Sequence, residues 1–344
     1  MTELSNEAPR VLRDVDLAPL TTFAVKARAA HFARVESVEQ LKNLLADERL
    51  AGLPRFVLGG GSNVLFTRDF EGLVIGIGIK GFELIDETED LRRIRLGAGC
   101  EWSAVVDETL ARGWPGLENL ALVPGTVGGA VVQNIGAYGL EVAERIERVH
   151  CLDSRTLEPV DFTVDACDYG YRTSLFKSPE ASHLIVTGVD LVLPKAFEPR
   201  VSYKELAAVF SDKAPETALE VADAVKEIRR RKLPDPNVLP NAGSFFKNPV
   251  VTRVKLRHLL QDTPQLVSYP LAGGRAKLAA AWLIEAVGMK GRREGEAGVY
   301  DRQALVIVNY GGATGAQIKA LADQVAHKVW MRFGVRLEPE PVII

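Results

Sequence analysis

The segment from Gly116 to Gly139 constrains the fold of this chain more than any other. It is rich in glycine and poor in charge, and its apolar residues follow neither the helical nor the strand period. Small residues at this density let a backbone approach a flat or extended ligand closely, although close packing of helices is the alternative. We interpret the segment as a binding loop that contains a short helix.

A second glycine loop, Gly59 to Asn63, lies between the apolar runs Phe56–Leu58 and Val64–Phe66. Its three glycines would expose backbone N–H groups as an anion-binding nest, and Ser62 and Asn63 would add side-chain donors. A tight connection between two strands explains the same residues equally well. A pyrophosphate carrying a planar ring would suit two such loops that face each other.

A formal G-x-G-x-x-G pattern is present at Gly76, Gly78 and Gly81. The dinucleotide fingerprint requires a helix to begin at these glycines. Residues 82–86 alternate instead as a strand does, so we interpret the glycines as a turn between strands. No Gly-Lys-Ser or Gly-Lys-Thr of a Walker A loop occurs.

Elsewhere, short apolar runs of strand length are mixed with fewer helical patterns, which predicts an α+β fold. Residues before about Leu17 are expected to form a flexible lead-in. The predicted helices cover residues 38–45, 102–112, 217–231, 276–287 and 314–333. The predicted strands cover residues 56–58, 73–75, 94–96, 304–309 and 335–338, with further short strands between 145 and 193.

Composition excludes several classes of protein. The 344 residues include 42 Lys and Arg against 45 Asp and Glu, and this balance argues against a general nucleic-acid binder. Charge or glycine interrupts every long apolar run, so no membrane span or signal segment is expected. The three cysteines and five scattered histidines lack metal-ligand spacing. They fit reduced thiols in a cytoplasmic protein without a metal.

Three polar groups are candidates for chemistry. Ser244 lies in a glycine turn with Lys247 and Asn248, where a hydroxyl either donates a proton or simply caps the turn. Arg172 follows two tyrosines and suits a bidentate carboxylate clamp, although a surface arginine is the ordinary alternative. Glu338 and Glu340 would share a face of an extended strand or belong to a solvated tail.

Five motifs together carry a resemblance to a known family. They are Gly60–Asn63, Gly116–Gly139, Gly170–Arg172, Asn241–Pro249 and Leu337–Glu340. In this order and spacing they resemble the UDP-N-acetylenolpyruvoylglucosamine reductases of peptidoglycan precursor synthesis, over about residues 20–340. Val201–Leu206 resembles the tyrosine loop of the subgroup that closes over its substrate.

The resemblance implies an FAD-binding module of the vanillyl-alcohol oxidase (PCMH) type in two subdomains, together with an α/β substrate-binding domain. The first subdomain would span 1–80 and include the C-terminal strand 334–344, the second would span 81–220, and the substrate domain 221–333. The implied activity is the NADPH-dependent reduction of the enolpyruvyl group of the nucleotide sugar to UDP-N-acetylmuramate, through non-covalent FAD, by a cytoplasmic monomer.

The resemblance also assigns residue roles. Arg172 would clamp the substrate carboxylate, Ser244 would donate a proton to the substrate carbon, and Glu340 would complete the site. Residues implied to hold the substrate are Tyr171, Tyr203, Lys232, Asn248 and Gln303. Residues implied to hold FAD are Gly59, Gly60, Gly61, Ser62, Asn63, Pro124, Gly125, Thr126, Gly128, Gly129, Asn134, Gly136 and Tyr138.

Two other functions remain open at this point. A flavin-dependent oxidase or dehydrogenase of the same superfamily often tethers FAD through His or Cys, and no His lies near either glycine loop. A nucleotide-sugar binder that has lost its flavin is the second. The intact glycine loops, with Arg172, Ser244 and Glu340, argue against it.

Overall fold

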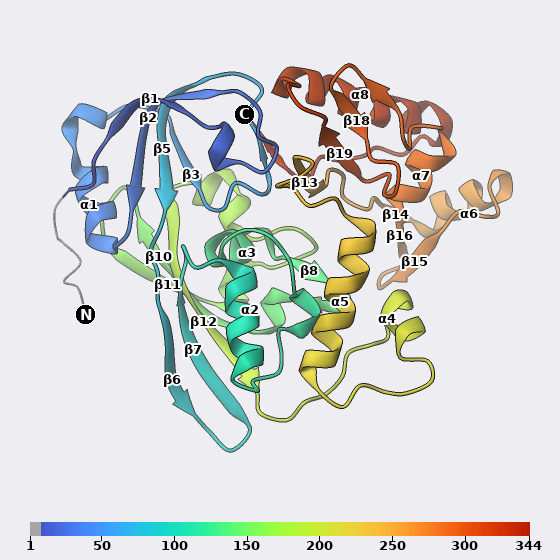
Figure 1. Ribbon diagram of the computed structural model, residues 1–344, viewed down its shortest axis with the longest axis horizontal. Coiled ribbons are helices and arrows are strands. Elements are labelled where there is room, and N and C mark those ends of the chain that lie inside the picture. The colour runs from blue at the N-terminus through green and yellow to red at the C-terminus, as the bar shows by residue number, and fades with distance from the viewer. Residues whose placement is uncertain (1–7) are drawn as a thin grey trace. The chain divides into compact units, whose positions relative to one another are not determined.

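A computed structural model describes residues 8–344 of the chain (Figure 1). The described residues form two compact units, and both combine sheets with helices, which confirms the predicted α+β class. Unit 1 contains residues 8–15, 29–61 and 71–230, and unit 2 contains residues 16–28, 62–70 and 231–344.

The first sheet of unit 1 positions the glycine loop. Its strand order is β1–β2–β5–β3, and the pairing of β3 with β5 is parallel. The strands are β1 (Leu12–Asp16), β2 (Arg28–Val35), β5 (Phe70–Ile77) and β3 (Arg55–Leu58). Helix α1 (Val38–Ala46) begins at Ser37, whose hydroxyl accepts a hydrogen bond from the backbone N–H of Gln40.

The second sheet of unit 1 is antiparallel and has the order β11–β10–β12–β7–β6. Helices α2 (Trp102–Ala111) and α3 (Val127–Gln133) share one hydrophobic core with it. Because β5 ends at Ile77 and β6 begins at Phe82, no helix opens at Gly76–Gly81, and the rejection of a dinucleotide fingerprint is confirmed. The strands are β6 (Phe82–Glu87), β7 (Leu91–Gly97), β10 (Ile146–Asp153), β11 (Pro159–Thr163) and β12 (Leu184–Pro194).

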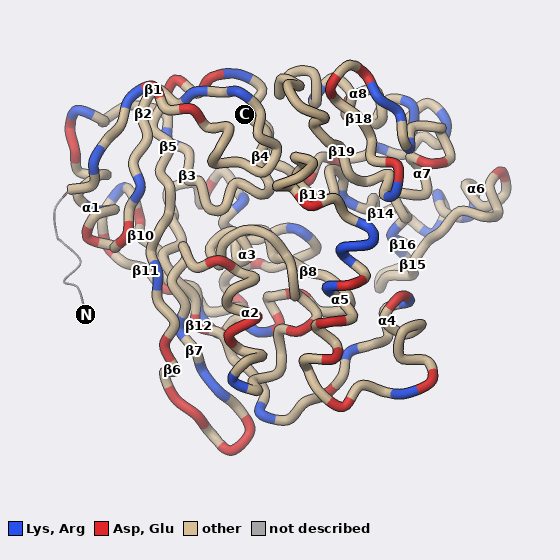
Figure 2. The backbone as a smooth tube through the Cα atoms, viewed as in Figure 1, with Lys and Arg blue, Asp and Glu red and all other residues tan. Residues whose placement is uncertain are grey.

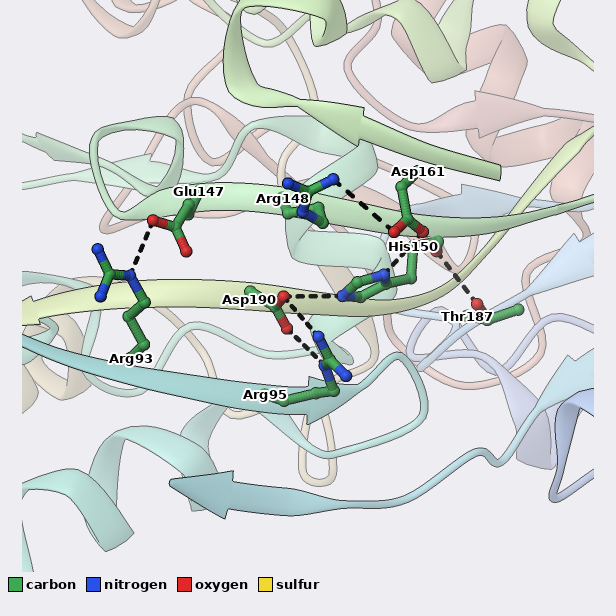
Figure 3. Close-up of polar contacts among 8 residues, drawn as sticks. All are labelled: Arg93, Arg95, Glu147, Arg148, His150, Asp161, Thr187 and Asp190. Atoms are coloured by element: carbon green, nitrogen blue, oxygen red, sulfur yellow. Dashed lines mark hydrogen bonds and ion pairs between the residues drawn. The ribbon is translucent and has the colours of Figure 1, made fainter. Parts of the chain in front are cut away.

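Polar contacts join neighbouring strands of this second sheet (Figure 3). Arg95 pairs with Asp190 through two hydrogen bonds, Nε to Oδ1 at 2.7 Å and Nη2 to Oδ2 at 2.9 Å. His150 lies between two carboxylates, with Nδ1 2.8 Å from Asp161 and Nε2 3.0 Å from Asp190. Burial alone would raise the pKa of Asp190, but hydrogen bonds from Arg95 and His150 outweigh it and lower that pKa.

Smaller elements complete unit 1. Segment 136–141 forms a short hairpin directly after α3, and α5 carries a basic run at its C-terminal end (Figure 2). These elements are β8 (Gly136–Ala137), β9 (Leu140–Glu141), α4 (Lys204–Val209) and α5 (Ala218–Lys232), whose last two residues belong to unit 2.

Unit 2 is built around an antiparallel sheet of order β13–β19–β18–β17, against which helix α8 packs. A three-stranded antiparallel sheet, β14–β16–β15, accompanies α6, and β20 pairs with β4 in parallel. The strands are β4 (Val64–Leu65), β13 (Asn241–Ser244), β14 (Val250–Thr252), β15 (Ser268–Leu271), β16 (Arg275–Leu278), β17 (Arg293–Glu294), β18 (Ala297–Val299), β19 (Val306–Asn309) and β20 (Val342–Ile343). The helices are α6 (Arg253–Asp262), α7 (Ala280–Ala286) and α8 (Gly315–Phe333).

Three local predictions are wrong. Residues 12–16 are strand β1 rather than a flexible lead-in, and residues 1–7 of that lead-in lie outside the described part. The predicted helix 276–287 begins only at Ala280, because residues 276–278 pair with two strands as β16. Residues 335–338 form no strand; Pro339 and Pro341, which follow them, have no N–H to donate to a regular ladder.

The division into three parts stays a prediction. It differs from the two units at several points: most of α5 clusters with unit 1, and segments 16–28, 62–70 and 334–344 cluster with unit 2. The C-terminal strand does pair with β4, which lies within the predicted first subdomain.

Candidate active site

The two glycine loops lie against each other within unit 1. A Cβ atom on Gly60 would come within 2.8 Å of the Cα atom of Gly125, and one on Gly59 within 2.6 Å of the Thr126 Oγ1 atom. No side chain larger than hydrogen fits at either position unless a neighbour moves. Gly59 and Gly60 are nevertheless exposed. The loops therefore present bare backbone, as an anion-binding nest requires.

The second glycine loop also starts helix α3. The Thr126 hydroxyl accepts from the N–H of Gly129 at 3.5 Å and so caps the helix. Gly128 lets the helix approach the sheet, because a Cβ there would lie 3.0 Å from the Cβ of Ala98. Gly125 has φ +113°, in the region that favours glycine. Thr126 and Gly128 therefore stabilise the fold, in addition to any contact that they make with a cofactor.

Arg172 lies in a tight turn of unit 1. Gly170 and Thr173 form an isolated β-bridge with two backbone hydrogen bonds of 3.1 Å, and Arg172 has φ +56°. The Arg172 Nη2 atom donates to the carbonyl oxygen of Gly136 at 2.7 Å. A Cβ atom on Gly136 would lie 3.2 Å from Arg172 Nη1, so glycine leaves room for the guanidinium. The guanidinium also lies over the Tyr171 ring, 5.2 Å from its centroid.

The Asn134 side chain is engaged within the protein, and the role of this residue in cofactor binding stays a prediction. It is fully buried, and its Nδ2 atom donates to Gly170 O and to Glu141 Oε2, both at 2.9 Å. Its Oδ1 atom accepts from the backbone N–H of Ala143 at 3.2 Å. The side-chain amide is therefore committed to protein groups rather than to a cofactor.

Two aromatic rings predicted to serve the cofactor and the substrate meet within unit 1. Tyr138 and Tyr203 pack edge to face, with ring centroids 5.3 Å apart. The buried Asn119 donates to the carbonyl oxygens of Tyr138 and Arg200, both at 2.8 Å, and so ties the glycine segment to the start of the tyrosine loop. Tyr203 itself is 44% exposed.

Two residues of unit 1 that the sequence did not single out, Arg229 and Lys177, also contact predicted site residues. Burial lowers the pKa of Arg229, a shift that the neighbouring Tyr138 hydroxyl opposes, and its Nε atom has no hydrogen-bond partner among the described residues. The basic run 229–232 is a pattern that the C-terminal end of a helix alone accounts for, so it gives no local sign of this burial. Lys177 contacts the Arg172 turn, and nothing in its local sequence indicates that contact.

Unit 2 brings Ser244 and Glu340 together. The backbone N–H of Glu340 donates to Phe245 O at 2.8 Å, and Phe246 forms an isolated antiparallel bridge with Pro339. The C-terminal segment thereby runs beside the residues that follow Ser244. Asn63 joins the same group, because its Nδ2 atom donates to Glu340 O at 3.2 Å.

Local structure holds Ser244 in place. It is half-buried at the end of β13 and pairs with Val306 of β19. Gly243 has φ +68°, and its N–H donates to the Asn241 side chain at 2.8 Å. The next two residues, Phe245 and Phe246, are buried with ring centroids 5.2 Å apart.

The remaining predicted residues of unit 2 lie at element ends. The Asn248 Oδ1 atom accepts from Ala280 N at 2.9 Å, at the start of α7. Gln303 lies in the turn before β19, and its backbone oxygen accepts from Val306 N at 3.0 Å. Lys232 is the last residue of α5, and Ser62 immediately precedes Asn63.

Residues 8–344 contain neither a metal-binding cluster nor a membrane-spanning helix. No group of three or more His, Cys, Asp or Glu side chains there is arranged to hold a metal ion. None of the helices in that range is sufficiently long and apolar to span a bilayer.

Two family models match the chain. One, described as the C-terminal domain of UDP-N-acetylenolpyruvoylglucosamine reductase, matches residues 235–344, and another, an FAD binding domain, matches residues 29–156. The UDP-N-acetylenolpyruvoylglucosamine reductase of Burkholderia mallei (strain NCTC 10229) is 49% identical over 343 residues, 98% of this chain and 99% of that protein. The reductase of Paraburkholderia phymatum is 48% identical over 337 residues, 97% of each.

Solved structures agree in fold. The reductase (MurB) from Thermus caldophilus has a TM-score of 0.69 at 26% identity, covering 97% of this chain and 99% of its own. A 6-hydroxy-D-nicotine oxidase from Arthrobacter nicotinovorans has a TM-score of 0.52 at 14% identity, covering 98% and 88%, which shows the fold alone. The α+β FAD-binding fold is thus confirmed. With identity near one half over almost its whole length, the chain belongs to the UDP-N-acetylenolpyruvoylglucosamine reductase family.

Proposed function

We propose that this protein catalyses the NADPH-dependent reduction of the enolpyruvyl group of UDP-N-acetylenolpyruvoylglucosamine to UDP-N-acetylmuramate, with FAD as a non-covalent cofactor. The backbone pairing of Glu340 with Phe245 is the observation that carries the proposal, because it brings the backbone of Glu340 next to the residue that follows Ser244. The family relationship supports the choice of substrate.

The glycine loops fit the FAD diphosphate. Gly59 and Gly60 are exposed positions where a Cβ would collide with Thr126 or Gly125, so they offer backbone N–H groups without side chains in front of them. Gly61, Ser62, Pro124, Gly125 and Gly129 continue the same two loops. Bound there, FAD would supply the hydride that adds to the methylene carbon of the substrate.

Arg172 would clamp the substrate carboxylate. Its fork of N–H donors matches a carboxylate in two-point contact, and it would stabilise the negative charge that develops next to the carboxylate when hydride adds. One nitrogen is already directed by Gly136 O. Tyr171 supports the guanidinium from one side.

Ser244 would donate its proton to the carbon that becomes electron-rich. A hydroxyl is a weak acid, but a carbanion is a strong base, so the pairing is chemically reasonable. Glu340 would stay near the substrate carboxyl in protonated form or through water, because two bare carboxylates repel each other. We propose that Ser244, Glu340 and Arg172 act on the same substrate molecule.

Four polar residues would hold the nucleotide part of the substrate. These are Tyr203, Lys232, Asn248 and Gln303, with Tyr203 on a loop that closes after binding. The other proposals that accompany this function are a cytoplasmic location, a monomeric state and the division at residues 80 and 220.

The test is an anaerobic absorbance experiment in two stages. The purified flavoprotein is first reduced with NADPH, and enolpyruvyl-UDP-N-acetylglucosamine is then added. Prompt return of the oxidised flavin spectrum is expected. A flavin that reoxidises only when oxygen is admitted would overturn the proposal in favour of an oxidase, and acid precipitation would show whether the flavin is tethered. A colourless protein that FAD cannot reconstitute would point to a binding protein.

A further inference from the structure

The C-terminal end of α3 holds the turn that carries Arg172. Three groups in a row make the contacts: Val132 O accepts from the Ser174 hydroxyl at 2.7 Å, Gln133 Oε1 accepts from Lys177 Nζ at 2.7 Å, and Asn134 Nδ2 donates to Gly170 O at 2.9 Å. Ser174 and Asn134 are both buried. The segment from Gly170 to Lys177 is therefore fixed to one helix end at three points.

Two of these contacts act on the backbone of the turn itself. Gly170 O, which closes the turn with Thr173 N–H, also receives the Asn134 amide. Lys177 Nζ donates to Arg172 O at 3.1 Å. Arg172 has φ +56°, a left-handed conformation that a residue with a side chain keeps only where the surroundings determine it. The bonds from Asn134 to Gly170 O and from Lys177 to Arg172 O fix the backbone on either side of Arg172.

A mere packing role explains these contacts less well. Asn134 uses three of its four hydrogen-bonding positions, both N–H donors and one lone pair of Oδ1, and it is itself left-handed at φ +43°. A polar side chain with both donors and its oxygen engaged fixes a geometry that an apolar residue of the same size would leave loose.

We propose that Asn134 and Lys177 are positioning residues that hold the Arg172 guanidinium where it meets the substrate carboxylate. They do not touch the substrate in this proposal; they act through the backbone of the Arg172 turn. The inference rests on the proposed function and adds to it the two residues on which the precision of the carboxylate clamp depends.

The test compares two nucleotide sugars that differ in the carboxylate. UDP-N-acetylmuramate has the carboxylate that Arg172 would clamp, and UDP-N-acetylglucosamine lacks it. In Lys177→Met, which keeps the stem and removes the ammonium, calorimetry should show weaker binding of the first by about 10-fold. Binding of the second should stay within about 2-fold, because it makes no use of the clamp.

Kinetics give a second readout. In the same variant, reoxidation of reduced flavin by the enolpyruvyl substrate should slow by about 10- to 100-fold. This is the loss expected when a catalytic group is displaced by up to about 1 Å. Reduction by NADPH and FAD content should be unchanged. Lys177→Arg, which restores a charged donor, should recover most of the loss.

Lys226→Met is the matched control. Lys226 is in the same unit and its Nζ atom lies 2.7 Å from Asp107, remote in sequence from the Arg172 turn. It should behave as wild type in calorimetry, in both half-reactions and in FAD content. Asn134→Asp, which replaces the donating NH₂ by an oxygen facing Glu141, tests the second residue and should repeat the Lys177→Met pattern.

A double variant distinguishes positioning from general damage. If Lys177 acts through Arg172, adding Lys177→Met to Arg172→Ala should produce almost no further loss. Additive losses, or equal weakening of both nucleotide sugars, would overturn the inference. If wild type itself fails to reoxidise with the enolpyruvyl substrate, the proposed function fails instead, so the two failures are distinguishable.

Discussion

The Arg172 turn of unit 1 and the Ser244–Glu340 pair of unit 2 are held in different ways. Two backbone bonds between Gly170 and Thr173 close the turn, and side chains anchor it to the rest of the unit. Asn134 donates to Gly170 O, Lys177 donates to Arg172 O, and the Ser174 hydroxyl donates to Val132 O. Backbone pairing is the main support of the pair, through Glu340 N to Phe245 O at 2.8 Å and Lys247 N to Glu338 O at 3.0 Å, and the Asn63 side chain adds one bond to Glu340 O.

This difference determines what each region tolerates. Backbone hydrogen bonds survive most side-chain substitutions, whereas a side-chain hydrogen bond is lost with the residue that makes it. Unit 2 should therefore tolerate substitution around its reactive groups but not loss of chain. Unit 1 should be sensitive to single substitutions that lie some residues away from Arg172.

The largest expected effect is at Ser244. Ser244→Ala keeps the backbone pairing with Val306, so the fold and the NADPH half-reaction should be preserved. Reoxidation by the enolpyruvyl substrate should slow by about 10²- to 10⁴-fold, because the proton donor is gone. Stopped-flow absorbance measures both steps. Equal slowing of the two steps would contradict the role of Ser244.

Arg172→Lys should have the next largest effect. Lysine keeps the charge but loses the planar fork and its bond to Gly136 O, so turnover should fall by about 10²- to 10³-fold. Flavin content, read from the absorbance ratio of the purified protein, should stay at the wild-type level. Loss of flavin would instead make Arg172 a cofactor residue.

Deletion of residues 342–344 tests the role of backbone in unit 2. It removes three backbone hydrogen bonds: Val342 N to Asn63 O, Ile344 N to Leu65 O, and Thr67 N to Ile344 O. The free energy of unfolding in urea should fall by about 2–4 kcal/mol, at roughly 1 kcal/mol for each bond. Val342→Ala, whose side chain is 40% exposed, should cost less than about 1 kcal/mol. If both variants lost a similar amount of unfolding free energy, backbone pairing would not be the main support of this part of unit 2.

The smallest effect concerns the side-chain contacts of the second sheet. Because contacts with Arg95 and His150 lower the pKa of folded Asp190, its carboxylate contributes stability above the unfolded pKa of about 3.9. That contribution, about 1 kcal/mol or less at this partly exposed pair, is lost as the pH falls through the lower folded pKa. Asp190→Asn should flatten the decline in unfolding free energy between pH 6 and pH 3. An unchanged slope would count against the contribution of this carboxylate.

Sequence reasoning located the glycine loops but not the groups that hold Arg172. A glycine loop is visible locally, since composition and a preceding apolar run suffice to indicate it. The bond from Asn134 to Gly170 joins residues 36 positions apart, and no local pattern encodes such a partner. The resemblance placed Asn134 with the cofactor, whereas its side chain is turned into the protein.

The same distinction explains the errors in unit 2. Strand β16 was predicted as part of a helix because residues 276–287 are rich in alanine and leucine, and only pairing with β14 and β15 makes its first residues extended. The segment before Glu340 was predicted as a strand, but its role depends on two backbone bonds to residues 245–247.

Helix α3 has a consequence for length variation in the chain. It begins at the loop beside Gly59 and Gly60 and ends at the anchor of the Arg172 turn, with seven residues between. One inserted residue would move its far end by about 1.5 Å and rotate it by about 100°. Insertions should therefore be excluded from α3, while the exposed tip between β6 and β7 should accept them. For this helix, the number of residues should be under selection together with the identity of Gly128 and Gln133.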